Sequence, residues 1–284
     1  MAKLKDLIIK YINHQKKFWR DEVAQSHLHR KLNVNVKTLY DQVHQSAEPL
    51  FVLSTGRSGT KLLSDIIALD PKCIVAHQPS PELTHSAWYA YQNHGEKFNE
   101  LCQIIDACRY EIIRDTWILG KKYIETNNRI TFFAPYLADL FPKAKFIHLK
   151  RDPYQFITSG YSRNWYAYEK LFDEGKITPR KKDQIPWDRY TQVQKIAWLW
   201  KETNGFIDQF MTSLPSQRKL FLESDELYSS VEKIANLLSF AGINTISPKQ
   251  IRSKISTPVN AQPNKSRKPL NTQQRDEIDQ ILNS

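Results

Sequence analysis

The chain has 284 residues, of which 40% are hydrophobic and 12% aromatic, enough to build a sizeable core and too many for a globally disordered protein. Its 41 Lys and Arg against 30 Asp and Glu leave a net charge of +11, so we expect an anionic partner, whether nucleic acid, membrane or polyanionic cofactor. Cys73, Cys102 and Cys108 lack metal-ligand spacing, which excludes a disulfide scaffold or a structural zinc site as the organising principle. The sequence shows no apolar run of about 18 residues, as a membrane-spanning helix needs, and we expect a cytoplasmic protein.

Residues 1–48 differ in pattern from the rest of the chain. Apolar residues from Leu4 to Trp19 recur at helical spacing with lysines between them, which predicts a basic amphipathic helix. Its apolar stripe could pack on the body of the protein, pair with a second copy in a homodimer, or lie on an anionic membrane. The four histidines of this segment have no zinc-ligand partners and are expected to be solvated: His14, His27, His29 and His44. We therefore separate an N-terminal helical segment, 1–48, from a domain, 49–284.

From residue 49 onward, short apolar runs alternate with helical patterns. The predicted strands are 51–54, 73–77, 130–133, 145–149 and 219–222, and the predicted helices are 60–69, 100–126, 135–142, 153–165, 190–213, 227–240 and 272–282. Nearly continuous apolar strands separated by helices are typical of buried parallel sheets. The sequence thus predicts an α/β protein with three layers and a central parallel sheet. In such folds ligands bind beyond the carboxyl ends of the strands.

The first motif at such a position joins the predicted strand 51–54 to the predicted helix 60–69. Gly56 and Gly59 allow backbone N–H groups to turn inward, and Arg57 and Lys61 add positive charge at the start of a helix, a combination that suits an anion. Gly59 is followed by Thr60 rather than Lys, so the Walker A pattern is absent. An ordinary strand-to-helix turn is the alternative interpretation.

The segment Thr55–Leu63 resembles the 5′-phosphosulfate loop of sulfotransferases that use 3′-phosphoadenosine 5′-phosphosulfate (PAPS). That loop commonly has a basic residue followed by Ser-Gly-Thr-Thr and an apolar helix. Lys61 departs from the second threonine, and it would either contact the donor or face an anionic acceptor. The resemblance implies that the phosphosulfate is held by Arg57, Ser58, Gly59, Thr60, Lys61 and Leu62.

The second motif follows the predicted strand 145–149. Arg151 stands at the end of this strand, Pro153 suits the first turn of a helix, and Ser159 lies two turns further on. A guanidinium and a hydroxyl so placed can bind a terminal phosphate. The pattern resembles the 3′-phosphate site of the same sulfotransferases, where a serine follows eight residues after the arginine of Arg-Asp-Pro. The alternative is a surface ion pair between Arg151 and Asp152 with Ser159 as an ordinary helix residue.

Both motifs occur in the expected order, and the chain is identified as resembling PAPS-dependent sulfotransferases over roughly residues 50–240, with a P-loop-like fold. Members commonly place a Glu or His base after the strand that follows the phosphate loop. This chain has Gln78 where many relatives have Glu, which leaves His77 first and Glu82 second as candidate catalytic bases. His85 is a distant third, and His77 could instead only hydrogen-bond the loop.

A third feature is the absence of Asp and Glu from Lys233 to Arg275, where eight basic residues occur. One-sided charge of this kind suggests a site for negative charge. Members of the resembled family commonly close a late basic loop over the nucleotide, so we expect 252–268 to do so, with Lys265 and Arg267 as the contacts. A basic patch for a membrane or an anionic acceptor is the alternative.

The resemblance implies transfer of a sulfuryl group from PAPS to a hydroxyl or amine, leaving 3′-phosphoadenosine 5′-phosphate (PAP), with no metal. The acceptor could be a small molecule, a saccharide or a lipid, shaped by the segments around 78–128 and 163–190; a nucleic-acid partner is not expected. One rival function is a nucleotide-dependent phosphotransferase, disfavoured by the missing Gly-Lys-Ser/Thr. The other is a non-enzymatic binder of anionic surfaces, suggested by the net charge of +11.

Overall fold

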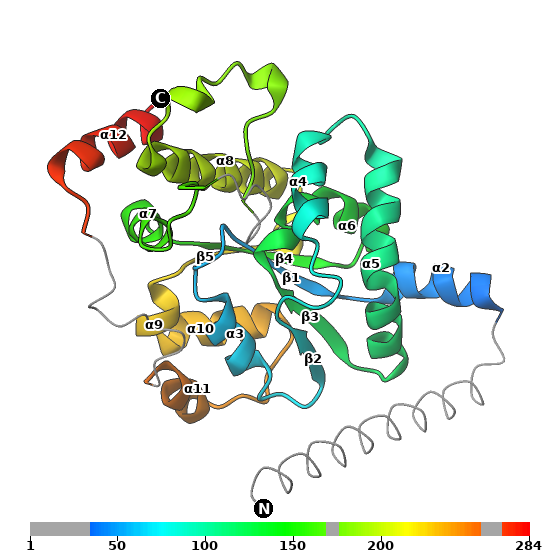
Figure 1. Ribbon diagram of the computed structural model, residues 1–284. Helices are drawn as coiled ribbons and strands as arrows, with labels where there is room; N and C mark the ends of the chain where they lie inside the picture. The colour runs from blue at the N-terminus through cyan, green and yellow to red at the C-terminus, as the bar shows by residue number, and fades with distance from the viewer. Residues whose placement is uncertain (1–34, 169–175, 257–268) are drawn as a thin grey trace, which may run out of the picture. The chain divides into compact units, whose positions relative to one another are not determined.

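A computed structural model describes residues 35–168, 176–256 and 269–284 (Figure 1). The predicted amphipathic helix at the N-terminus and the predicted nucleotide contacts Lys265 and Arg267 lie outside these residues. The division into 1–48 and 49–284 therefore stays a prediction. No helix in the described part of the chain is long and apolar enough to cross a membrane.

A parallel sheet forms the centre of the unit His44–Ser284. Its strands are β1 (Leu50–Leu53), β2 (Cys73–Ala76), β3 (Lys122–Thr126), β4 (Lys145–Lys150) and β5 (Lys219–Glu223), in the order β2-β3-β1-β4-β5. Each pairing is parallel, with Leu50 opposite Ile124 on one side and Lys145 on the other. All five carboxyl ends therefore point to one edge, where ligands bind in such sheets.

Helices cover both faces of this sheet (Figure 1). The helices are α3 (Thr60–Ile67), α4 (Thr84–Gln92), α5 (Phe98–Ile118), α6 (Ala134–Leu140), α7 (Pro153–Tyr161), α8 (Gln192–Thr212), α9 (Glu226–Ser229), α10 (Val231–Phe240), α11 (Pro248–Ile255) and α12 (Thr272–Leu282). Leu50 and Val52 share a buried cluster with α3, α10 and α11, whereas Phe51 meets Tyr123 and Phe146 instead. This alternation along β1 gives the sheet two buried faces, which confirms the predicted α/β fold with three layers.

One predicted strand is wrong. Residues 130–133 belong to a 3-10 helix, η1 (Asn128–Phe133), and the true strand β3 lies inside the predicted helix 100–126. Helix α5 ends early because Gly120 has a φ of 65°, and the N–H of Lys121 donates to the carbonyl of Thr116. This left-handed cap reverses the chain after the helix and frees the next residues to enter the sheet.

His44 also departs from its expected exposure. It lies in helix α2 (Val36–Ser46), its side chain is buried, and its Nε2 atom is 2.8 Å from Asp106 Oδ1. Its ring stacks against Tyr110 and Phe141. The expectation that His44 is solvated is therefore wrong: a carboxylate and two rings satisfy both the polar and the apolar parts of the imidazole.

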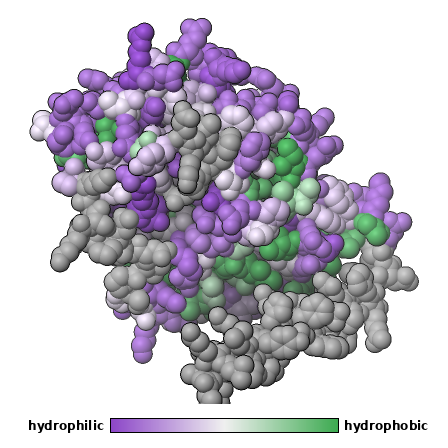
Figure 2. Space-filling model, in the orientation of Figure 1, coloured by the Kyte–Doolittle hydropathy of each residue, from purple (hydrophilic) through white to green (hydrophobic). Residues whose placement is uncertain are grey.

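The face seen in Figure 2 is mostly hydrophilic, with apolar side chains gathered toward the centre and right of the view. Such a distribution is ordinary for a domain whose helices turn their charged sides to water. The polar groups on this surface therefore need no functional explanation. Those at the carboxyl edge of the sheet, where ligands bind in such folds, do.

Candidate active site

The turn between β1 and α3 is a tightly folded loop with a left-handed backbone at three positions. Gly56 has a φ of 82°, Arg57 of 57° and Gly59 of 86°. Within the loop, Gly56 N–H donates to Ser54 Oγ at 3.1 Å and Ser58 Oγ donates to Gly56 O at 3.0 Å. Left-handed backbone at a residue other than glycine costs free energy and is concentrated at functional sites. The first turn of α3 leaves its N–H groups without helical partners, so the loop ends in a helix start of the kind that suits an anion.

Neighbouring elements fix this loop from outside. Arg151, just after β4, donates from Nη1 to the carbonyl of Arg57 at 2.6 Å. Ser224, just after β5, donates from Oγ to the carbonyl of Ser58 at 2.5 Å. Thr131 in η1 donates to the carbonyl of Ser54 at 3.1 Å. The loop is thus held rigid by residues far away in sequence, and neither Ser224 nor Thr131 was predicted.

The two predicted arginines converge on the same small region. Besides the bond between Arg151 and the Arg57 backbone, both guanidinium groups lower the pKa of Tyr228, although burial raises it overall. A methyl group on Gly59 would stand 3.1 Å from the Tyr228 hydroxyl. The Arg57 Nε atom is buried and has no hydrogen-bond partner among the described residues. An unsatisfied buried donor on a guanidinium is chemically suited to an anionic ligand.

The residues of the second predicted phosphate-binding pair lie on the expected elements, Arg151 just after β4 and Ser159 in α7. Asp152 caps α7 by accepting from Gln155 N–H at 2.9 Å, so it serves the helix start. Ser159 accepts from Arg163 Nη1 at 2.6 Å on its Oγ. Arg163 therefore places a guanidinium beside Ser159. In the sequence, only its i,i+4 spacing from Ser159 marks Arg163 as a neighbour of that serine, and this spacing is too common to single out a residue.

The two candidate bases have different surroundings. His77, directly after β2, is half-buried, and its Nδ1 atom is 2.9 Å from Thr126 Oγ1 at the end of β3. Burial lowers the pKa of His77 below its ordinary 6.5; a hydrogen bond with the Thr126 backbone opposes this, Lys61 lowers the pKa further and Asp65 raises it. His77 thus lies within electrostatic reach of the phosphate loop helix, where Lys61 is bonded to Asp65.

Glu82 is more open to solvent, with 63% of its side chain exposed, and its carboxylate is 2.7 Å from Arg129 Nη1. The carboxylate of Glu82 is thus engaged by a neighbouring guanidinium. His85 is exposed on the first turn of α4, near the rings of Trp88 and Tyr89. The structure places all three on the segment that follows β2.

A buried network underlies this segment. Arg109 of α5 donates to both carboxylate oxygens of Glu125, at 2.8 and 3.0 Å, and both side chains are fully buried. Glu125 also accepts from Tyr123 and Asn127, and Arg109 Nη1 reaches the carbonyl of Pro81 at 3.1 Å. The network thereby ties the segment carrying His77 and Glu82 to strand β3.

A model of the sulfotransferase family matches residues 49–245. The chain belongs to this family. Sulfotransferase STF9 from Mycobacterium avium superposes with a TM-score of 0.50 and 14% identity, over 92% of this chain and 82% of that one. A sulfotransferase from Alicyclobacillus acidocaldarius gives 0.49 and 14%, covering 84% and 92%. The sulfotransferase domain of the Synechococcus PCC 7002 olefin synthase gives 0.47 and 15%, covering 83% and 95%. No curated protein sequence matches the chain.

The protein is thus a sulfotransferase enzyme with the P-loop-like fold of a PAPS-dependent family. The match includes the phosphate loop, the segment after β2, and the β4–α7 junction with Arg151 and Ser159. Sulfotransferases of this family generally use PAPS. The residues at the carboxyl edge fit such a donor, because a nucleotide with two separate anionic ends needs cationic groups on two separate elements.

Proposed function

We propose that this sulfotransferase takes the sulfuryl group of PAPS and transfers it to a hydroxyl or amine of an acceptor. The observation that carries the proposal is the contact between Arg151 and the backbone of Arg57. It joins the two predicted phosphate sites, on β4 and on the phosphate loop, into one cationic cradle. The unpartnered Nε of Arg57 supports an anionic occupant of that cradle.

Each end of the donor has its own set of residues in this proposal. Arg57, Lys61 and the N–H groups at the start of α3 would hold the 5′-phosphosulfate, and Arg151, Ser159 and Arg163 the 3′-phosphate. PAPS, when bound, supplies an activated sulfuryl group on a phosphate that leaves readily. The part of Arg57 and Lys61 is to stabilise the negative charge that grows at the 5′ end during transfer.

We propose that His77 is the base that removes the proton from the acceptor hydroxyl or amine. Its Nδ1 atom is engaged with Thr126 Oγ1 at 2.9 Å, which fixes the ring and leaves Nε2 to accept a proton. Because burial lowers the pKa of His77, its neutral form, the form that can act as a base, dominates at pH 7. Glu82, paired with Arg129, is the alternative base.

The donor proposal is tested by calorimetric titration with PAP. We expect PAP to bind and Arg151→Ala to weaken it by about tenfold or more, since one charged hydrogen bond contributes roughly 1.5–3 kcal/mol. Arg114→Ala is the matched control, because Arg114 pairs with Asp115 and Glu111 on α5, away from the loop. Equally tight binding of magnesium ATP, with no effect of Arg151→Ala, would instead support a phosphotransferase.

Catalysis is tested separately with PAPS carrying radioactive sulfate. Label should appear in a sulfate ester or sulfamate of a pooled acceptor mixture, and Arg57→Ala should slow its appearance more than it weakens PAP binding. If the protein binds PAP but transfers no label to any class of acceptor, the proposed sulfuryl transfer is contradicted.

A further inference from the structure

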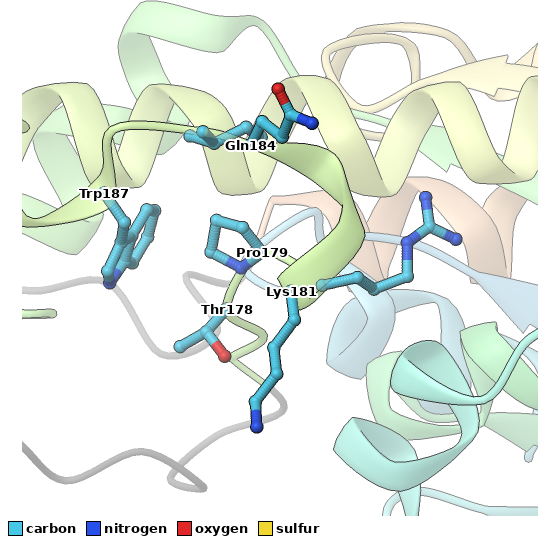
Figure 3. A pocket seen from close by; sticks show the side chains of 7 residues that line it. Thr178, Pro179, Lys181, Gln184 and Trp187 are labelled. Atoms are coloured by element: carbon cyan, nitrogen blue, oxygen red, sulfur yellow. The ribbon is translucent and has the colours of Figure 1, made fainter.

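A separate cavity lies in the stretch between α7 and α8 (Figure 3). Its volume is about 330 Å³, and seven residues line it: Thr178, Pro179, Arg180, Lys181, Gln184, Ile185 and Trp187. The size is at the lower end of ligand pockets. Four of these seven residues are polar or charged and none is acidic. The cavity therefore suits a polar, negatively charged ligand better than a lipid tail or an unsubstituted phenol.

The indole of Trp187 is held in place by its neighbours. Tyr166 and Trp198 meet it edge-on, with ring centroids 5.3 and 5.0 Å away. The ammonium of Lys195 lies 5.2 Å from the ring centroid. A ring fixed on several sides loses little entropy when a ligand packs on it. In Figure 3 it stands beside the ring of Pro179, which gives the cavity an apolar wall for a flat or chair-shaped ring.

Two cations line the cavity in different ways. Arg180 is engaged by Asp183 at 3.1 Å and Glu202 at 3.6 Å, and it lies over the ring of Tyr91. Lys181 is exposed, and its ammonium extends to the same side as the Thr178 hydroxyl (Figure 3). Because the charge of Arg180 is already balanced, Lys181 is the group that would meet a carboxylate or sulfate.

Helix α4 connects the cavity to the segment of the candidate bases. Trp88 Nε1 donates to Thr178 Oγ1 at 3.1 Å, and Gln92 donates to the carbonyl of Thr178 at 2.8 Å. The helix begins at Thr84, two residues after Glu82. Trp88 is four residues further, which corresponds to about 6 Å along the helix axis. An acceptor made of several linked rings could therefore occupy the cavity and still extend toward His77.

From these observations we propose that the cavity binds an acidic pyranose unit of an oligosaccharide acceptor. The sugar ring would pack on Trp187 and Pro179, its carboxylate or sulfate would pair with Lys181, and its hydroxyls would meet Thr178 and Gln184. The inference rests on the proposed function, because it concerns the acceptor of the same transfer, but binding can be measured without any transfer.

The test compares two tetrasaccharides of equal length in the full chain, with and without saturating PAP. Unsulfated chondroitin tetrasaccharide carries glucuronate carboxylates, and cellotetraose is neutral. Calorimetry should show the acidic sugar binding at least tenfold more tightly. Lys181→Gln should weaken the acidic sugar about fivefold and leave the neutral sugar unchanged, whereas Trp187→Ala should weaken both.

Two control variants keep the outcome interpretable. Lys182→Gln removes a neighbouring lysine that pairs with Glu96 and does not line the cavity, and Trp117→Ala removes a half-buried tryptophan of α5; neither should change sugar binding. Equal affinity for the two sugars, or no effect of Lys181→Gln, would overturn the inference while PAP binding left the donor assignment standing. Selective sugar binding without PAP binding would instead overturn the proposed function, and with it the role of the sugar as acceptor, while the cavity would remain a binding site for acidic saccharides.

Discussion

At the scale of single residues, the surroundings of His77 decide which base is available. The ring is half-buried beside Thr126, and Lys61 of the phosphate loop helix adds a positive field. Both effects disfavour a second proton on the imidazole. Glu82, by contrast, is bound to a guanidinium and faces water, whereas His77 lies within electrostatic reach of Lys61 on the phosphate loop helix, and this position favours His77 as the base.

We predict that His77 titrates below pH 6.5 in the folded protein. The chemical shifts of its ring protons, followed by NMR across about pH 4–8, should give a lower titration midpoint in the folded chain. The same histidine in the chain unfolded in urea serves as the reference. The unfolded chain then binds the proton more readily, so protonation of His77 removes stability as the pH falls through this range. A midpoint at or above 6.5 would contradict the assignment.

The residues that could be predicted are those that directly follow a strand in a recognisable pattern. Arg57, His77 and Arg151 were found in this way, and the structure brings Arg57 and Arg151 together. Ser224 was missed because its contact with Ser58 spans 166 positions and a lone serine carries no pattern. Arg163 was missed for a different reason: its partner Ser159 is only one turn away, and this spacing is too common to single out a residue.

At the scale of elements, the misplaced third strand shows where pattern analysis fails. Residues 130–133 are buried in η1 and apolar except for Thr131, and apolar runs of this length do not distinguish a strand from a helical turn. The Gly120 cap that ends α5 was visible in the sequence, but the helical pattern continued across it. As a result the pairing of Arg109 with Glu125 could not be foreseen, because it joins the two elements that were merged.

This buried pair should contribute strongly to stability. Replacing Arg109 by Leu leaves the carboxylate of Glu125 buried without its guanidinium, so we expect a loss of about 3–5 kcal/mol in the free energy of unfolding, measured by urea denaturation. The double variant Arg109→Leu with Glu125→Leu removes both buried charges and should recover much of that loss.

The surface arginine Arg114 provides the control for this prediction. Its ion pairs with Glu111 and Asp115 are partly exposed, and Arg114→Ala should cost about 1 kcal/mol or less. A double variant as unstable as Arg109→Leu alone would show that the pair acts through more than charge compensation, for example through the bond of Arg109 to Pro81.

At the scale of the whole molecule, the candidate donor site exists only in the folded chain. Arg57 and Arg151 are 94 positions apart, and Ser224 brings β5 to the same loop. An unfolded chain cannot assemble these groups, so a donor analogue should bind the native state alone and stabilise it by mass action. Donor binding and folding are therefore coupled across the sheet, because the site is built from residues that follow the carboxyl ends of β1, β4 and β5.

We therefore predict a thermal shift that depends on both ends of the nucleotide. At about one hundred times its dissociation constant, PAP should stabilise the native state by roughly 2.7 kcal/mol, which for a unit of this size corresponds to a rise of about 5–10 °C in Tm. At the same concentration adenosine 5′-phosphosulfate, which lacks the 3′-phosphate, should raise Tm less, because Arg151 and Ser159 lose their ligand. In the Arg151→Ala variant the Tm shifts caused by the two nucleotides should become nearly equal. In the Arg114→Ala variant they should still differ as they do in the unmodified chain. Equal shifts for both nucleotides in the unmodified chain would mean that the β4–α7 junction does not bind the 3′-phosphate.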